Sequence, residues 1–122
     1  MRALIIDDSR AARSWVRLMM VELGFDTVEA PDGWEGLQSL HQHWPLDLIL
    51  VDWNMPELDG HQFVQTVRAD PLLGKVPMMM VTSEVEMERL RTALDAGVDE
   101  YLMKPFTKEA LSEKLGLMGL VD

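Results

Sequence analysis

Short apolar runs alternate with amphipathic stretches five times along this chain, and this alternation limits the possible folds more than any other feature of the sequence. A run of consecutive apolar residues is typical of a β-strand that is covered on both faces, as in a parallel sheet. The strand candidates are residues 3–7, 25–30, 47–52, 77–82 and 100–104. Strands that alternate with helices in so short a chain predict an α/β fold, in which right-handed crossovers place helices on both faces of one parallel sheet.

The segments between the strands carry apolar residues at helical spacing, so each is expected to form a helix with one face against the sheet. The four apolar stripes are Ala12, Trp15, Met19 and Leu23; Trp34, Leu37, Leu40 or His41, and Trp44; Phe63, Val64 and Val67; and Met87, Leu90 and Leu94. Three helix starts are marked by capping pairs, which are Asp32 with Glu35, Asp59 with Gln62, and Ser83 with Glu86. Gly24 and Gly97 are expected to end two of the helices. Gly116 and Gly119 interrupt the last segment, which predicts a fifth helix that is short or frayed at its end.

The composition excludes several classes of protein. A chain of 122 residues suits one domain with a single core. The absence of cysteine rules out disulfides and Cys-ligated metal sites. The formal net charge of -10 disfavours direct contact with nucleic-acid phosphates. The N-terminus is unlike a signal peptide and no stretch approaches the roughly 20 apolar residues that span a bilayer, so we expect a soluble cytoplasmic protein without membrane contact.

Polar residues follow the apolar runs at the carboxyl ends of four strands. The first run leads into Asp7 and Asp8, the third ends on Asp52, the fourth on Thr82 and the fifth on Lys104. Functional residues of open parallel sheets gather just outside these ends, so these side chains are expected to converge. Crowded carboxylates repel one another unless a cation lies among them. A site with few carboxylates and several waters suits Mg²⁺.

Single residues of these types usually have structural roles. An Asp after a strand is most often a solvated turn residue or a helix cap, so only the combination of residues from four strands predicts a site. Trp53 follows Asp52 directly and is expected to pack away from the site, because strand side chains alternate between faces. Met78, Met79 and Met80 are assigned to the core rather than to a methionine-rich binding surface.

The motifs at these strand ends resemble those of bacterial response-regulator receiver domains. The matching stretches are DD at 7–8, DWNMPELDG at 52–60, VTSE at 81–84 and YLMKPF at 101–106. They cover essentially the whole chain in the expected order, which implies one receiver domain over residues 1–122. Within the family, the motifs are most similar to those of the single-domain chemotaxis regulators. The resemblance implies a flavodoxin-like (CheY-like), doubly wound sheet of five parallel strands in the order 2-1-3-4-5.

The resemblance also implies a phosphoacceptor and a metal site. Asp52 would accept a phosphoryl group. Mg²⁺ (or Mn²⁺) would be bound by the side chains of Asp8 and Asp52 and by the backbone carbonyl of Asn54, and Asp7 would reach it through water. Asn54 and Glu84 would flank the route of the hydrolytic water and so tune the lifetime of the phosphoryl group.

A second set of residues is implied to bind the phosphoryl group and to transmit its presence. Lys104 would supply a cation and Thr82 a switch hydroxyl, while Tyr101 would change rotamer when Thr82 moves. The peptide bond before Pro105 would be cis. Local charge at the strand ends would thereby become a change of surface shape.

The implied partners are proteins. A histidine kinase or a histidine phosphotransfer domain would donate the phosphoryl group, and a downstream target would bind the surface around residues 84–115. The chain would be a phosphoacceptor switch and not an enzyme, either a monomer or a weak phosphorylation-dependent dimer.

Two alternatives are weighed against a stand-alone regulator. The chain could be the excised receiver of a longer regulator with a DNA-binding or enzymatic output domain, but the final residues GLMGLVD do not read as a linker. A phosphatase of the haloacid dehalogenase type also uses a strand-end Asp with Mg²⁺. Such enzymes need a second Asp two residues after the nucleophile, and Asn54 occupies that position and cannot transfer a proton.

Overall fold

The computed structural model describes residues 1–53, 60–82 and 87–121. Within these residues the strands are β1 (Arg2–Ile6), β2 (Asp26–Ala30), β3 (Leu48–Asp52), β4 (Met78–Thr82) and β5 (Glu100–Met103). Neighbouring strands are parallel, and their order is β2-β1-β3-β4-β5. The predicted doubly wound α/β fold and its strand order are confirmed, and the predicted strand bounds differ from the observed ones by at most one residue.

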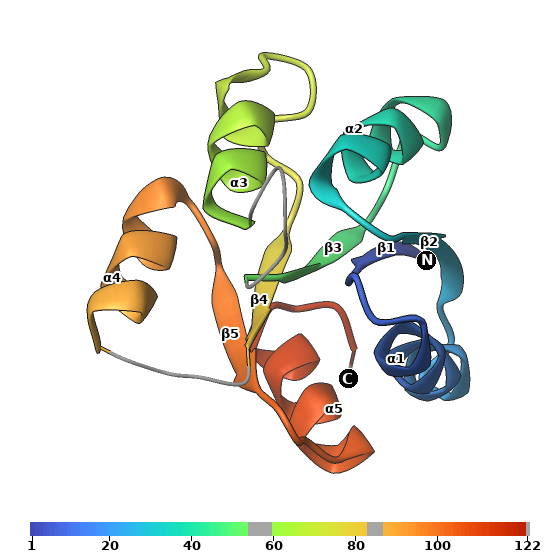
Figure 1. Ribbon diagram of the computed structural model, residues 1–122. Helices are drawn as coiled ribbons and strands as arrows, with labels where there is room; N and C mark the ends of the chain where they lie inside the picture. Colours follow the sequence, from blue (N-terminus) through green and yellow to red (C-terminus); the bar gives the residue numbers. More distant parts are fainter. Residues whose placement is uncertain (54–59, 83–86, 122) are drawn as a thin grey trace.

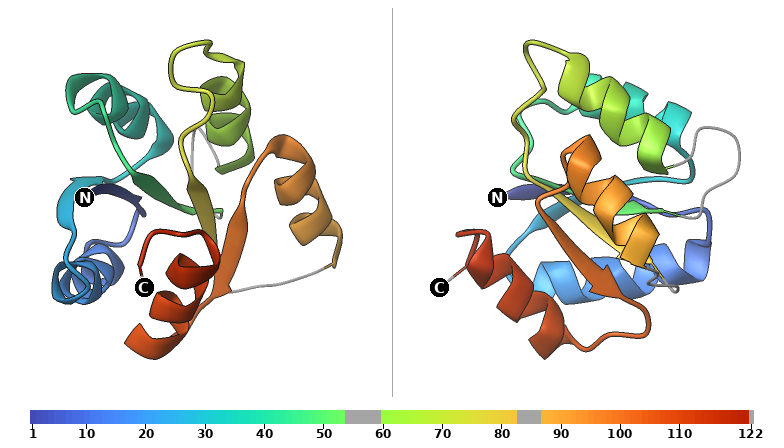
Figure 2. Two further views of the ribbon diagram at one scale, coloured as in Figure 1. Left: turned by 180° about the vertical axis from the view of Figure 1, so that it is seen from behind. Right: turned by 90° about the vertical axis from the view of Figure 1, so that its left-hand side faces the viewer.

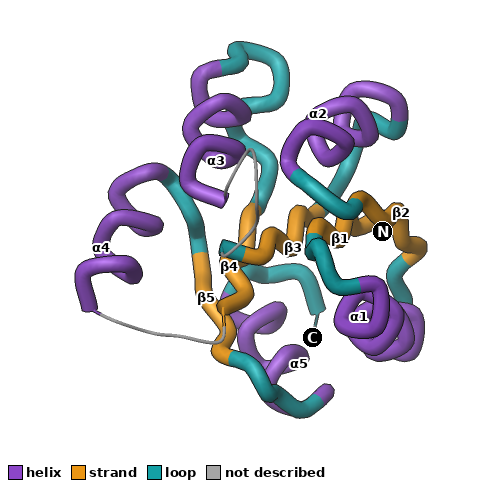
Figure 3. Tube along the Cα trace, in the orientation of Figure 1, coloured by secondary structure: helices purple, strands orange, loops and turns teal. Residues whose placement is uncertain are grey.

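The helices of the described residues are α1 (Arg10–Glu22), α2 (Gly33–Gln42), α3 (Gly60–Ala69), α4 (Met87–Ala96) and α5 (Lys108–Leu117). Helices α1 and α5 cover one face of the sheet, and α2, α3 and α4 cover the other (Figures 1 and 2). The strands occupy the centre of the molecule with the helices around them (Figure 3). None of the helices in the described part of the chain is long and apolar enough to cross a lipid bilayer.

Alternation of side chains along the central strands divides the core into two clusters. In β3, Ile49 and Val51 pack in the cluster with residues of α2, α3 and α4, whereas Leu48 and Leu50 pack in the cluster with residues of α1 and α5. Every residue of β3 and β4 is buried, which explains why both strands read as continuous apolar runs. The methionines Met78–Met80 belong to the core, as predicted, and contribute to both clusters.

The predicted helix face is correct on α3 and correct in part on the other helices, where Met19, Leu40 and Leu90 pack in or against the core. Trp15 is 45% exposed and Trp34 is 60% exposed, although both were expected to face the sheet. The residues that are buried on α1 and α2 are Val16, Met19 and Met20, and Gly33, Gly36 and Leu40. A Cβ at Gly36 would lie 2.6 Å from a side chain of β1, so α2 approaches the sheet through glycine rather than through its largest apolar residue. On α4, similarly, Ala93 is buried and Leu94 is exposed.

The helix start predicted at Asp32 is confirmed. The Oδ1 atom of Asp32 accepts a hydrogen bond from the N–H of Glu35 at 2.8 Å and thus satisfies one of the free donors of the first turn of α2. The capping pairs that begin with Asp59 and Ser83 include residues that lie outside the described part of the chain, as does the side chain of Met87.

Glycines end three of the helices. Gly24 and Gly97 have φ angles of 95° and 115° and end α1 and α4 in the left-handed conformation, as predicted. The expectation of a short fifth helix was wrong. Helix α5 has ten residues, continues through Gly116 to Leu117, and is ended by Gly119 with a φ angle of 76°. The second glycine therefore terminates the helix cleanly, because it supplies a conformation that other residues rarely adopt.

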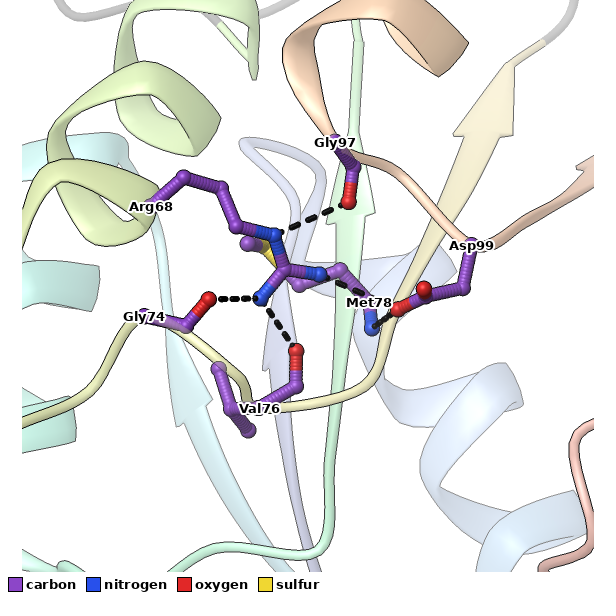
Figure 4. A network of polar contacts seen from close by, with 6 residues as sticks. All are labelled: Arg68, Gly74, Val76, Met78, Gly97 and Asp99. Carbon is purple, nitrogen blue, oxygen red and sulfur yellow. Dashed lines mark hydrogen bonds and ion pairs between the residues drawn. The ribbon is translucent and has the colours of Figure 1, made fainter.

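Arg68, near the end of α3, ties together the segments that precede β4 and β5 (Figure 4). Its guanidinium donates hydrogen bonds of 3.0, 2.6 and 2.9 Å to three backbone carbonyls, those of Gly74, Val76 and Gly97. It also donates to the carboxylate of Asp99 at 3.0 Å, and the same Asp99 oxygen accepts the N–H of Met78 at 2.9 Å. Burial lowers the pKa of Arg68, and the charge and hydrogen bond of Asp99 oppose that shift. The network satisfies backbone groups where the chain enters the sheet.

Candidate functional site

The polar residues predicted to converge lie together at the carboxyl edge of the sheet. Asp7 and Asp8 follow β1, Asp52 and Thr82 are the last residues of β3 and β4, and Lys104 follows β5. Ile5, Leu50 and Leu102 pack toward α1 and α5. Asp7, Asp52 and Lys104 each lie two residues after one of them. Asp7, Asp52 and Lys104 are therefore directed toward the same face of the sheet.

The carboxylates of Asp7, Asp8 and Asp52 form a compact anionic cluster. One oxygen of each lies within 4.8 Å of the others. Asp7 and Asp52 are only 4% and 6% exposed, whereas Asp8 is exposed to solvent. Because buried charges are poorly solvated, three carboxylates at this separation repel one another strongly unless a cation compensates them.

Lys104 supplies one compensating charge. Its Nζ lies 2.7 Å from Oδ2 of Asp7 and 3.9 Å from Oδ2 of Asp52. Three carboxylates and one ammonium group leave two negative charges in this set of four side chains at neutral pH. The site thus has a deficit of positive charge.

Both carboxylate oxygens of Asp7 already accept hydrogen bonds. Oδ1 accepts the N–H of Ser9 at 2.9 Å, and Oδ2 accepts Nζ of Lys104 at 2.7 Å. Its own N–H donates to the carbonyl of Ala30, which extends the β1–β2 ladder beyond the strand. The carboxylate of Asp7 is therefore held in one orientation, and a further cation would meet fewer free lone pairs on it than on Asp8.

The donor set fits a small divalent cation. All of its side-chain ligands are carboxylate oxygens, which Mg²⁺ and Mn²⁺ prefer. Two oxygens bound to one Mg²⁺ lie at most about 4.2 Å apart, because each bond is about 2.1 Å long. The observed limit of 4.8 Å is close to that value and suits a site in which one carboxylate acts through water. Asn54, expected to contribute a carbonyl, lies outside the described residues.

Thr82 and Tyr101 lie on the face opposite to the carboxylates. Tyr101 pairs with Met80, two residues before Thr82, so both side chains are directed toward the layer of α3 and α4. Thr82 is buried, and its carbonyl accepts the N–H of Lys104 at 2.7 Å. Tyr101 is half-buried against the core, with Nζ of Lys114 4.2 Å above its ring. The structure thus joins the backbones of Thr82 and Lys104, whose side chains are directed toward opposite faces of the sheet, and Tyr101 lies on the neighbouring strand on the same face as Thr82.

Trp53 packs away from the carboxylates, as the alternation of strand residues predicts. It is buried in the cluster of α2, α3 and α4, with the ring of His61 5.9 Å away. Gly60 begins α3 directly against this point, where a Cβ would lie 2.9 Å from Cα of Trp53 and 3.0 Å from the carbonyl oxygen of Asp52. The sequence did not predict this close approach at Gly60, although Gly60 is the last residue of the DWNMPELDG motif.

Two further residues complete the comparison with the sequence. The Lys104–Pro105 peptide bond is cis, the isomer that the resemblance implies. Glu84 lies outside the described residues. The sequence reasoning missed Arg13, which contacts the backbone of Asp7 from α1, because a single arginine on a helix carries no signal that distinguishes it from a surface charge.

The chain is similar to known proteins in sequence and in structure. Residues 3–116 match the response regulator receiver domain family. The chain is 39% identical over 116 residues to chemotaxis protein CheY1 of Helicobacter pylori, covering 94% of each chain. It is 40% identical over 116 residues to chemotaxis protein CheY of Pseudomonas aeruginosa, covering 94% of this chain and 93% of that one. The structure of chemotaxis protein CheY4 of Vibrio cholerae is similar with a TM-score of 0.89 and 31% identity, over 95% of this chain and 96% of that one.

Proposed function

This chain belongs to the response regulator receiver domain family, and we propose that it acts in a phosphorelay by accepting a phosphoryl group on Asp52 from a histidine kinase or a histidine phosphotransfer domain. The observation that carries this proposal is the position of Asp52. Its carboxylate ends a fully buried strand, lies in a cluster with two further carboxylates, and has the Lys104 ammonium 3.9 Å away.

The proposed reaction is a phosphoryl transfer between side chains. A carboxylate oxygen of Asp52 attacks phosphorus, the phosphorus–nitrogen bond to the donor imidazole breaks, and the imidazole nitrogen keeps the electron pair and takes up a proton. Lys104 offsets the negative charge of the phosphoryl oxygens. Asp8, Asp52 and the carbonyl of Asn54 would hold Mg²⁺ (or Mn²⁺), with Asp7 reaching it through water, and the bound ion would add further positive charge at the same oxygens.

The proposed output is a change at the surface formed by α4, β5 and α5. The new acyl phosphate carries about -1.5 to -2 charge and offers acceptor oxygens to the hydroxyl of Thr82. Movement of Thr82 changes the packing available to Tyr101 on the neighbouring strand. A protein target on the surface around residues 84–115 would then distinguish the two states. The names of the similar chemotaxis proteins favour an output in chemotaxis. Glu84 and Asn54 would tune the lifetime of the phosphoryl group.

Intact mass spectrometry tests the acceptor. The protein is incubated with Mg²⁺ and acetyl phosphate, and we expect the gain of one phosphoryl group. The Asp52→Asn variant, which keeps the size of the side chain, should gain none. Equal labelling of the variant would assign the phosphoryl group to another residue, and no labelling of the unmodified protein would contradict the proposal.

Amide hydrogen exchange tests the switch. Mg²⁺ with beryllofluoride, a stable phosphoryl mimic, should change protection both near Asp52 and in residues 82–106. In Thr82→Ala the change near Asp52 should persist while the change in 82–106 is lost, because the acceptor and Lys104 remain. A response confined to the surroundings of Asp52 in the unmodified protein would mean that the switch does not involve Thr82 and Tyr101.

A further inference from the structure

Arg13 reaches from α1 to the loop that carries two of the three carboxylates. Its Nη1 donates a hydrogen bond of 2.7 Å to the backbone carbonyl of Asp7. Its Nε lies 3.4 Å from Oε1 of Glu29, the residue before the end of β2. This Nε atom is buried and has no hydrogen bond among the described residues, so the ion pair with Glu29 is its closest compensation. The side chain thus connects the site loop with the edge strand of the sheet.

The contacted carbonyl belongs to the peptide group that joins Asp7 to Asp8. The N–H of Asp7 is bound to the carbonyl of Ala30, and the carbonyl of Asp7 is bound to Arg13, so the chain is held on both sides of the Asp7 Cα. The plane of this Asp7–Asp8 peptide group influences the direction in which the Asp8 side chain leaves the backbone. Asp8 is exposed, so packing does not orient it in place of this contact.

The charge of Arg13 should affect metal affinity in the opposite direction to its hydrogen bond with the Asp7 carbonyl. A guanidinium close to a metal site repels a divalent cation, and by charge alone its removal should tighten metal binding. Glu29 offsets this repulsion, and it also lies 4.0 Å from Nε of Arg17, one helical turn further along α1. Arg17 therefore shares the carboxylate partner of Arg13, whereas Arg13 alone of these two arginines donates to the carbonyl of Asp7. Replacement of Arg17 removes a positive charge alone, whereas replacement of Arg13 removes a positive charge and the contact with the Asp7 carbonyl. Comparison of the two therefore separates the effect of charge from that of positioning.

We propose that Arg13 is a positioning residue of the metal site, which orients the Asp8 carboxylate through the Asp7–Asp8 peptide group. This inference rests on the proposed binding of Mg²⁺ or Mn²⁺ at the carboxylate cluster. Residues that orient the ligands of a metal typically change its affinity by about 10- to 100-fold when they are replaced. Arg13 has that relation to Asp8, because it binds the backbone carbonyl of the preceding residue.

Mn²⁺ binding to the full chain tests the proposal, with the electron paramagnetic resonance signal of free Mn²⁺ as the measure. We expect Arg13→Met to weaken Mn²⁺ binding by about tenfold, because the loss of orientation outweighs the loss of a positive charge. The matched variant Arg17→Met, which loses the same charge and the same type of side chain, should bind Mn²⁺ as tightly as the unmodified protein or more tightly. A structural role alone would lower stability without separating the two variants in the affinity of the folded protein.

Equal or tighter binding by Arg13→Met, compared with Arg17→Met, would overturn the inference while the metal site stands. Failure of the metal site itself has a different signature, in which the unmodified protein binds no more Mn²⁺ than Asp8→Ala. Far-ultraviolet circular dichroism establishes that each variant is folded. If Arg13→Met does not fold, Arg13→Gln takes its place. The polar glutamine side chain suits this position but is too short to reach the carbonyl of Asp7. The same weakening relative to Arg17→Gln is then expected.

Discussion

The amino ends and the carboxyl ends of the strands both hold a cation among oxygen atoms, but the balance of charge differs. At the amino ends of β4 and β5, the guanidinium of Arg68 is matched to three carbonyls and one carboxylate at 2.6 to 3.0 Å. At the carboxyl ends, the ammonium of Lys104 faces a cluster with three carboxylates. The first arrangement is complete and supports the fold. The second arrangement is short of positive charge, so the binding of a further cation would stabilise it.

Replacing Arg68 should produce the largest change in stability. In Arg68→Met, three backbone carbonyls lose the hydrogen bonds from Arg68 and the carboxylate of Asp99 loses one of its two donors, so we expect the free energy of unfolding to fall by about 3 kcal/mol. Urea denaturation measures this loss. The folded variant should still accept a phosphoryl group, whereas Asp52→Asn should show the reverse pattern, with phosphoryl transfer lost and stability not reduced. If Arg68→Met left stability unchanged, the distinction between a structural and a functional end would be wrong.

Gly97 tests how tightly the Arg68 network is packed. An alanine there would keep an unfavourable φ of +115° and place its Cβ 2.9 Å from Cγ and Nε of Arg68. We expect Gly97→Ala to lower the free energy of unfolding by about 2 kcal/mol. Gly24 offers a matched control, because its φ is +95° but a Cβ would meet no atom within 4 Å. Gly24→Ala should therefore cost only the backbone strain of about 1 kcal/mol, and equal losses would show that Arg68 moves aside freely.

At the carboxyl ends, removal of a charged group should have the opposite sign. Asp8→Ala relieves repulsion within the carboxylate cluster, so the metal-free melting temperature should rise by about 2 °C. Addition of Mg²⁺ should raise the melting temperature of the unmodified protein and have little effect on the variant, since a ligand stabilises only the state that binds it. Thermal unfolding with EDTA and then with Mg²⁺ measures both effects. A full Mg²⁺ response in Asp8→Ala would remove this residue from the site.

An exposed ion pair sets the lower limit of these effects. Nζ of Lys108 lies 2.8 Å from Oε2 of Glu22 at the surface, and this hydrogen bond raises the pKa of Lys108. A raised lysine pKa favours the protonated folded state, so any stabilisation is present below the ordinary pKa of 10.5 and is lost as the pH rises through the raised value. Solvent screens such a pair, and Lys108→Met should shift the melting temperature at pH 7 by less than about 1 °C. A larger shift would show that ion pairing stabilises this protein without burial.

The sequence predicted the sheet and the meeting of polar residues at its carboxyl edge because both depend on short-range patterns. Continuous apolar runs identified β3 and β4, and the alternation of strand residues separated Asp52 from Trp53. The helix faces were harder, because α2 packs through Gly36 and leaves Trp34 exposed, whereas a hydrophobic pattern gives most weight to large side chains. The arginines were missed for a related reason.

Arg13 and Arg68 both act on backbone carbonyls. A carbonyl is present at every residue and therefore leaves no mark in the sequence of the segment that it belongs to. Residues that bind side chains, such as Lys104 with Asp7, can be inferred from the types of both partners. Residues that bind the backbone can be found only when the three-dimensional path of the chain is known.

The unequal exposure of the tryptophans gives this protein a spectroscopic probe next to its proposed phosphoacceptor. Trp53 is buried beside Asp52, whereas Trp15 and Trp34 are open to solvent. A small quencher in solution would therefore suppress emission from the two exposed indoles and leave Trp53 with a larger share of the remaining signal. Acrylamide suits this purpose better than iodide, because the net charge of -10 repels anions. Under such quenching, occupancy of the site becomes an optical measurement that needs no attached label.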